Sequence, residues 1–178
     1  MKLRLAVAAV FATAAVAACQ TVPRPPAAEP VVDVRANMVE GVNPAALAIW
    51  DVGNAALNED NGLDPAQMND AAWAKMADGA QSLASYAHRL ATAQELRASG
   101  PDLVGGKVPE GVASREQIQA KIDADPAGFR ASAAELERYA NGIAKAAKTR
   151  DIKTAGELVF TFDSNCQSCH ERYWYMKP

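Results

Sequence analysis

Two cysteines and a histidine lie close together near the C-terminus, in the run Cys166-Gln167-Ser168-Cys169-His170. On a helix, residues three apart share a face, so both thiols can form thioethers with the two vinyl groups of one porphyrin. His170 follows directly, and its imidazole can bind the iron as an axial ligand. The spacing therefore predicts a covalently attached haem c that is held and ligated by one turn of helix.

Other chemistry of the same two cysteines stays open at this point. A redox-active dithiol usually lies at a strand-to-helix junction, which the surrounding sequence does not indicate. A zinc site needs two further ligands, for which only His88 and carboxylates are left. A simple disulfide suits an oxidising compartment. We favour haem attachment and keep a haem-free scaffold with a disulfide as an alternative.

The composition indicates one helical domain that does not bind nucleic acid. The chain has 178 residues, of which 39 are alanine and only 6% are aromatic. Alanine favours helices, so we expect a core of small side chains between helices. Removing residues 1–18 takes away Lys2 and Arg4 and leaves 16 basic against 21 acidic residues. This negative net charge argues against a nucleic-acid surface.

The first 31 residues have the features of an export signal and a tether. Residues 1–18 combine a basic start with an uncharged apolar run that is shorter than the roughly 20 residues needed to span a bilayer. Positions 16–19 read V-A-A-C and resemble the lipobox of bacterial lipoproteins; ordinary cleavage after positions 15–17 is the alternative. Residues 19–31 are rich in proline and alanine and predict an extended tether. We therefore expect a periplasmic domain that is anchored to a bacterial membrane through lipid on Cys19.

Apolar residues recur at spacings of three and four in four stretches, which is typical of helices that bury one face. Short links with turn residues join the first pair and the last pair, so neighbouring helices should be antiparallel. Residues 32–178 are thus predicted to form an all-α antiparallel four-helix bundle. The four apolar sets are Val34, Met38, Val42, Ala45, Ile49, Val52 and Ala56; Trp73, Met76, Ala80, Leu83, Ala87 and Leu90; Phe129, Ala133, Leu136, Ala140, Ile143 and Ala147; and Ile152, Ala155, Val159, Phe162, Cys166, Cys169 and Tyr173.

Two interruptions of this pattern predict further local structure, one in the middle link and one in the first helix. The middle link, about residues 99–125, is longer than the others, and the capping-box pattern of Ser114 and Gln117 predicts a small helix there. Asn43-Pro44 falls inside the first helix, where proline removes a hydrogen bond. We expect the helix to restart there, with Asn43 as its cap. No strand pattern competes with the helical one.

The sequence resembles the class II c-type cytochromes, the cytochrome c′ family. The resemblance rests on Cys166-x-x-Cys169-His170 in the last of four helices, on Tyr173 after it, and on the order of the four stretches over residues 32–176. It implies a haem near one end of the bundle, where an alanine-rich core leaves room for a large flat cofactor. Relatives often dimerise through their first two helices, so a homodimer is a further expectation.

The resemblance implies two variants that differ at the sixth coordination position of the iron. In one, an apolar side chain leaves the iron five-coordinate and open to small gases such as nitric oxide. In the other, a methionine of the first helix ligates the iron and favours electron transfer, and Met38 stands where the family would place it. Met38 as a core residue without metal contact is the alternative. Met76, Met68 and His88 are weaker candidates for the ligand.

The resemblance also implies roles for charged residues near the haem. Arg35, one turn before Met38, would be a partner for a haem propionate, although relatives usually space the two residues by four positions rather than three. Trp174 stands where relatives often carry Arg or Lys. Either Arg172 supplies that charge or the electrostatics on this side of the haem differ from those of the family.

The sequence thus predicts a membrane-tethered periplasmic cytochrome that carries single electrons between redox partner proteins. His170 and Met38 would be its axial ligands, and we expect no enzymatic activity. Binding of nitric oxide or another small gas at a five-coordinate haem is the alternative.

Overall fold

The computed structural model describes residues 31–60, 62–100 and 108–176. The expected signal peptide (1–18), Cys19 and the rest of the expected tether up to residue 30 lie outside these residues. Among the described residues, no helix combines the length and the apolar character needed to cross a membrane.

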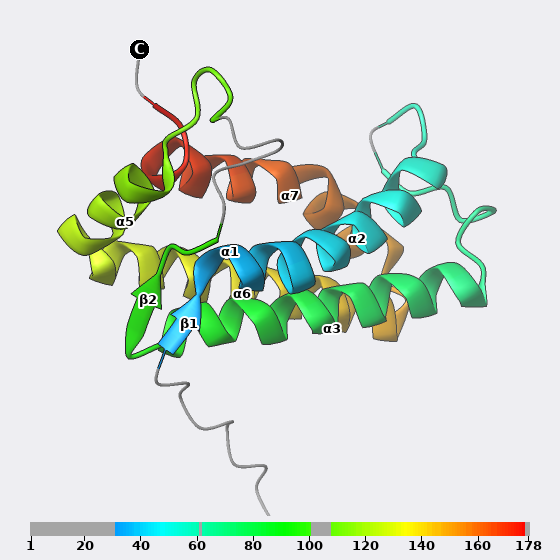
Figure 1. Cartoon of the computed structure of the whole chain (residues 1–178). Coiled ribbons are helices and arrows are strands. Elements are labelled where there is room, and N and C mark those ends of the chain that lie inside the picture. The colour runs from blue at the N-terminus through cyan, green and yellow to red at the C-terminus, as the bar shows by residue number, and fades with distance from the viewer. Residues whose placement is uncertain (1–30, 61, 101–107, 177–178) are drawn as a thin grey trace, which may run out of the picture.

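Four long helical segments of the described chain lie side by side and run alternately in opposite directions (Figure 1). The first segment joins three elements without a gap. Helix α3 packs against α2 and α6, and α7 packs against α6 and α2, which closes the bundle. The predicted all-α four-helix bundle is confirmed. The elements are α1 (Val34–Asn37), η1 (Met38–Val42), α2 (Asn43–Ala55), α3 (Asp70–Thr92), α6 (Pro126–Thr149) and α7 (Ile152–Tyr173).

The long helices begin where the sequence supplies capping side chains. Asn69 accepts a hydrogen bond from the amide of Ala72 at 3.0 Å and starts α3. Asp151 accepts one from the amide of Thr154 at 3.1 Å and starts α7. Arg150 ends α6 with a left-handed φ of 54°, so a very short turn leads from α6 into α7. This turn makes the two helices antiparallel neighbours.

The core of the bundle is built from the predicted apolar stretches. Its larger cluster contains fully buried side chains from all four segments, among them Ile49, Leu83, Ile143 and Phe162. Alanines fill many of the remaining buried positions of α3 and α6, which make the most extensive contact of any two helices described. Small side chains allow these helices to approach closely. A second, smaller cluster lies at the end of the bundle where α7 ends.

A short parallel pair of strands lies at that same end, and the sequence pattern does not predict it. Strand β1 (Val31–Asp33) pairs with β2 (Glu95–Arg97), with Val32 opposite Leu96. Strands of three residues are too short to show an alternating pattern. Val32 and Leu96 are buried in the smaller cluster, which holds the pair against the bundle.

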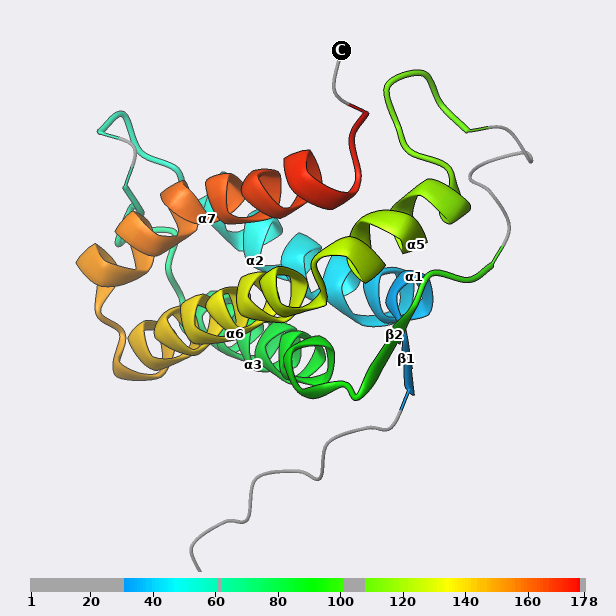
Figure 2. The same ribbon diagram turned by 90° about the vertical axis from the view of Figure 1, so that its left-hand side faces the viewer.

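Helix α5 (Arg115–Ala124) comes from the middle link and covers the same end of the bundle (Figure 2). Its predicted capping box is confirmed. The amide of Ser114 donates to Gln117 Oε1 at 2.8 Å, and the amide of Gln117 donates to Ser114 Oγ at 3.3 Å. Ile118 and Ile122 are buried in the smaller cluster, so α5 is an integral part of this end.

The first helical segment does not restart at Asn43, contrary to the sequence prediction. Asn43 has helical dihedral angles, φ −63° and ψ −51°, and the helix continues through it. Residues Met38–Val42 instead form a π-helical turn, in which the amide of Asn43 donates to the carbonyl of Met38. Pro44 lacks an amide hydrogen, and its ring would collide with the carbonyl four residues earlier in a regular α-helix. The wider turn takes up one extra residue and lets the helix pass the proline.

Asp125 connects the start of α6 to the end of α7. Its Oδ1 accepts from the amide of Gly128 at 2.9 Å, and its Oδ2 accepts from the hydroxyl of Tyr173 at 3.1 Å. We expect Asp125→Ala to lower the free energy of unfolding by about 2 kcal/mol, because a helix cap and a second hydrogen bond are both lost. Urea denaturation of the haem-loaded protein measures this change.

The matched control is Asn69→Ala, which removes a helix cap alone. It should cost about 1 kcal/mol. Equal losses in the two variants would show that the bond between Asp125 and Tyr173 contributes nothing.

Candidate haem site

The cysteines of the motif lie on the last turns of α7. Cys166 packs against the larger core cluster and Cys169 against the smaller one, and both are half-buried free thiols. Burial raises the pKa of both thiols to about 11, and the carboxylate of Asp163 adds to the rise at Cys166. Both sulfurs therefore stay protonated at neutral pH, unlike the thiolates of redox-active or zinc-binding cysteines.

The other chemistries considered for these cysteines find no support in their surroundings. The motif continues a long helix and does not lie at a strand-to-helix junction. Within the described parts of the chain, no three His, Cys, Asp or Glu side chains come together as a metal site. The thiols of Cys166 and Cys169 are also not joined to each other.

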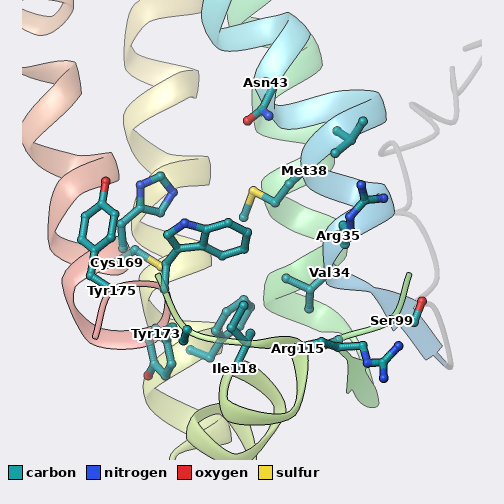
Figure 3. A pocket seen from close by; sticks show the side chains of 16 residues that line it. Val34, Arg35, Met38, Asn43, Ser99, Arg115, Ile118, Cys169, Tyr173 and Tyr175 are labelled. Atoms are coloured by element: carbon teal, nitrogen blue, oxygen red, sulfur yellow. The ribbon is translucent and has the colours of Figure 1, made fainter. Parts of the chain in front are cut away.

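A cavity of about 280 Å³ opens beside Cys169 and His170 (Figure 3). Its walls come from the start of the first helical segment, from α5, from the start of α6 and from the end of α7. The lining is mostly apolar and includes Val34, Ile118 and Phe129. A mostly apolar cavity beside a thiol and an imidazole fits a haem, whose ring is flat and apolar and whose iron takes nitrogen or sulfur ligands.

Met38 lines this cavity from the first helical segment, across from the wall of α7 that carries Cys169 (Figure 3). A thioether and an imidazole from opposite walls can bind the two faces of one haem iron. Met76 and Met68 are buried in the larger cluster and do not line the cavity. Of the methionines and histidines that the structure describes, only Met38 and His170 line it.

His88 lies elsewhere, between α3 and α6. Its Nδ1 is 3.0 Å from Glu137 Oε1, and neither side chain lines the cavity. The structure therefore gives no role to His88 as an axial ligand.

The imidazole of His170 lies among aromatic rings at the end of α7. Its centroid is 6.3 Å from the ring of Trp174 and 5.9 Å from the ring of Tyr175, which meets it edge-on. Burial lowers the pKa of His170, although the carboxylate of Asp163 acts in the opposite direction. The neutral ring keeps a nitrogen lone pair for a metal.

The middle link holds the chain that follows His170. Backbone bonds join residues 111–113 to residues 174–176, and α5 adds a lysine to the same contact. These bonds fix Trp174 at the edge of the cavity, a role that a capping pattern in the sequence cannot reveal. The bonds run from Ala113 N to Trp174 O (2.9 Å), from Met176 N to Gly111 O (2.8 Å) and from Lys121 Nζ to Tyr175 O (2.6 Å).

Arg35 lines the cavity one turn before Met38. Its Nε is buried and has no hydrogen-bond partner in the described part of the chain. Gly100 lies against the same side chain with a left-handed φ of 88°, and a Cβ there would be 3.0 Å from Arg35 Cδ. A buried guanidinium nitrogen without a partner is costly, so this corner suits an anionic group such as a haem carboxylate.

Arg172 does not line the cavity, although its charge acts on the thiol of Cys169, which does. Its Nη1 lies 3.8 Å from Asp125 Oδ2, and it is not part of the lining. Trp174 lines the cavity two residues later, so the wall beside His170 is aromatic rather than cationic.

A family model described as cytochrome C′ matches residues 66–174. The matched residues are more than half of the chain and include α3, α6 and α7 with the whole motif. The chain therefore belongs to the cytochrome c′ family, whose cofactor is covalently attached haem c. No curated protein and no solved structure matches the chain. The family match begins after the first helical segment, so it does not cover Arg35 or Met38.

Replacing both cysteines tests the attachment of the haem. We expect the double variant Cys166→Ser/Cys169→Ser to carry no covalent haem, because a hydroxyl does not form the thioether bond. Intact mass after denaturation should show polypeptide plus haem for the wild type and polypeptide alone for the variant. Ser168→Ala, between the two cysteines, should keep the full adduct. Covalent haem in the double variant would contradict the assignment.

Proposed function

We propose that this protein carries single electrons, with Cys166 and Cys169 as the anchors of its haem and His170 and Met38 as the two axial ligands. Membership of the family supports a haem-binding cytochrome that transfers electrons or binds gases. The observation that favours electron transfer is that Met38, from the first helical segment, lines the same cavity as His170 of α7. An iron with both axial positions filled has no vacant site for a gas and changes little when its charge changes.

Each residue of the site has a separate task. The haem, when bound, supplies one-electron redox chemistry. The thioether of Met38 is a soft ligand that raises the reduction potential relative to harder ligand pairs. The apolar lining keeps water away from the iron, and Arg35 offsets the charge of a haem carboxylate. None of these tasks needs a substrate site, which supports a carrier rather than an enzyme.

The proposal includes a tethered position in the periplasm. The leader and the V-A-A-C positions support lipid on Cys19, and residues 19–30, which precede β1, would reach about 40 Å from the membrane if extended. A domain on such a tether meets redox partner proteins, which we take to be its electron donor and acceptor. A homodimer through the first two helices belongs to the same proposal.

Gas binding is the second candidate. The side chain of Met38 has three rotatable bonds and is only half-buried, so it can leave the iron without disturbing the bundle. A five-coordinate iron in this apolar cavity would then bind nitric oxide or carbon monoxide.

Met38→Ala separates the two functions. We expect the ferric wild-type protein to show the far-red sulfur-to-iron charge-transfer absorption of methionine ligation and the variant to lack it. The ferrous variant should bind carbon monoxide at once, whereas the wild type should bind it slowly or not at all. Met76→Ala, in the core, is the control and should keep the absorption. A variant spectrum identical to that of the wild type would show that Met38 is not a ligand and would favour gas binding as the function.

Lipid attachment is tested by fractionation. We expect full-length protein with its leader, produced in a bacterium that exports and acylates lipoproteins, to sediment with membranes. Cys19→Ala should release it into the soluble periplasmic fraction, because no acyl chain can be added. Haem staining follows the protein in both fractions. Soluble wild-type protein would contradict the lipid anchor.

A further inference from the structure

The π-helical turn Met38–Val42 changes which side of the first helix faces the bundle. On its N-terminal side, the buried positions are Val34, Asn37 and, inside the turn, Gly41, which are spaced by three and four residues. On its C-terminal side, the buried positions start again at Val42, the last residue of the turn, and continue through Ala45. The two sets are out of phase by one residue, which corresponds to a rotation of about 100° about the helix axis.

This shift in phase decides where Met38 lies. In an uninterrupted α-helix, the row of Ile49, Ala45 and Val42 would extend back to Met38 and place its side chain in the core. The extra residue gives that core position to Asn37, which is only 3% exposed. Met38 is instead half-buried, touches both core clusters and lines the cavity.

Helix α3 holds the turn on both sides of Met38 through one residue, Tyr86. The side-chain amide of Asn37 donates to the carbonyl of Tyr86 at 3.1 Å. The ring of Tyr86 occupies the space where residue 41 would have a side chain, since a Cβ on Gly41 would fall among the atoms of that ring. Residues 37 and 41 are thus both fixed to α3, and the turn between them cannot rotate without breaking one of these contacts.

From these contacts we infer that Gly41 and Tyr86 are positioning residues, which lock the π-helical turn in the rotation that points the Met38 thioether at the haem iron. Pro44 disfavours the regular α-helical arrangement from the other side, because its ring would collide with the carbonyl four residues earlier. The inference rests on the proposed axial role of Met38 and adds the residues that set its position. Sequence spacing does not find them, because Tyr86 follows Met38 by 48 positions.

Crowding the contact tests this inference in the haem-loaded protein. Gly41→Ala forces the ring of Tyr86 and the turn apart, so we expect the far-red sulfur-to-iron absorption to weaken while the covalent haem stays in place. The rate of carbon monoxide binding to the ferrous protein should rise by about fivefold or more, because overpacking of this kind shifts equilibria by at least that factor. A purely structural role would change unfolding without moving either signal.

Variants of Tyr86 give a second, milder test. Tyr86→Ala removes the ring and should change both signals in the same direction, whereas Tyr86→Phe keeps the ring and should leave them at the wild-type level. The matched control is Gly79→Ala, which crowds α3 against α2 at a point away from the turn. Its Cβ would lie 3.1 Å from that of Ala48. It should keep the absorption. If Gly41→Ala yields no haem-loaded protein, the two Tyr86 variants decide.

The results distinguish this inference from the proposed function. Wild-type absorption that is lost in Met38→Ala but kept in Gly41→Ala and Tyr86→Ala would overturn the positioning role and leave Met38 as the ligand. Absorption that is already missing from the wild type would refute the ligand and the positioning role together. Loss in Gly41→Ala and Tyr86→Ala, with retention in Tyr86→Phe and Gly79→Ala, is the result that the inference predicts.

Discussion

A rigid, flat porphyrin that is bonded to one helical turn imposes its geometry on everything around it. In our proposal, the thioethers of Cys166 and Cys169 fix the ring to α7, and His170 fixes the iron. These three bonds leave the haem no freedom to adjust to the rest of the bundle, so the rest of the bundle must fit the haem. The cavity, the proposed second ligand Met38 and the cover over the end of α7 all follow from this constraint.

The bundle meets the constraint by dividing its length between two tasks. In the middle, alanines bring α3 and α6 close together and large side chains such as Phe162 fill the remaining space. At the other end, the smaller cluster is assembled from α5, the two short strands and the ends of the long helices. The four helices alone would leave this end open, and the middle link closes it. Stability and cofactor binding thus rely largely on different residues.

Much of the fold could be predicted because its signals are local. The spacing of apolar residues found all four long segments, and the capping box of Ser114 and Gln117 found α5. The motif Cys166-x-x-Cys169-His170 predicted the cofactor, because covalent attachment demands a fixed spacing along one helix. Each of these signals lies within a few turns of the chain.

The features that the sequence did not reveal depend on partners far away in the chain or on a single inserted residue. Strand β1 pairs with β2 across more than 60 residues, and each strand is too short to show a pattern. The sequence pattern does not predict the π-helical turn, because a spacing of four from Val34 to Met38 and from Met38 to Val42 also fits a regular α-helix. Asn43 was expected to cap a helix because Pro44 normally ends one, and only the contact with α3 shows how the helix continues.

The rotation of the first helical segment about its axis decides where the side chain of Met38 lies. In our proposal, a rotation by one residue separates a methionine that fills the core from one that ligates the iron. Proline and glycine, which are usually unfavourable inside helices, here act together: the ring of Pro44 disfavours the regular turn, and Gly41 leaves room for the ring of Tyr86 beside the wider one. These two residues lower the stability of the helix, and in our proposal they give the sulfur atom of Met38 a defined position.

X-ray absorption spectroscopy at the iron edge of the ferric, haem-loaded protein tests this account most directly. The thioether sulfurs of the attachment lie outside the first coordination shell of the iron, so a sulfur found within that shell belongs to an axial ligand. The account predicts one such sulfur together with five nitrogens, four from the porphyrin and one from His170. A first shell that contains only nitrogen or oxygen would contradict it.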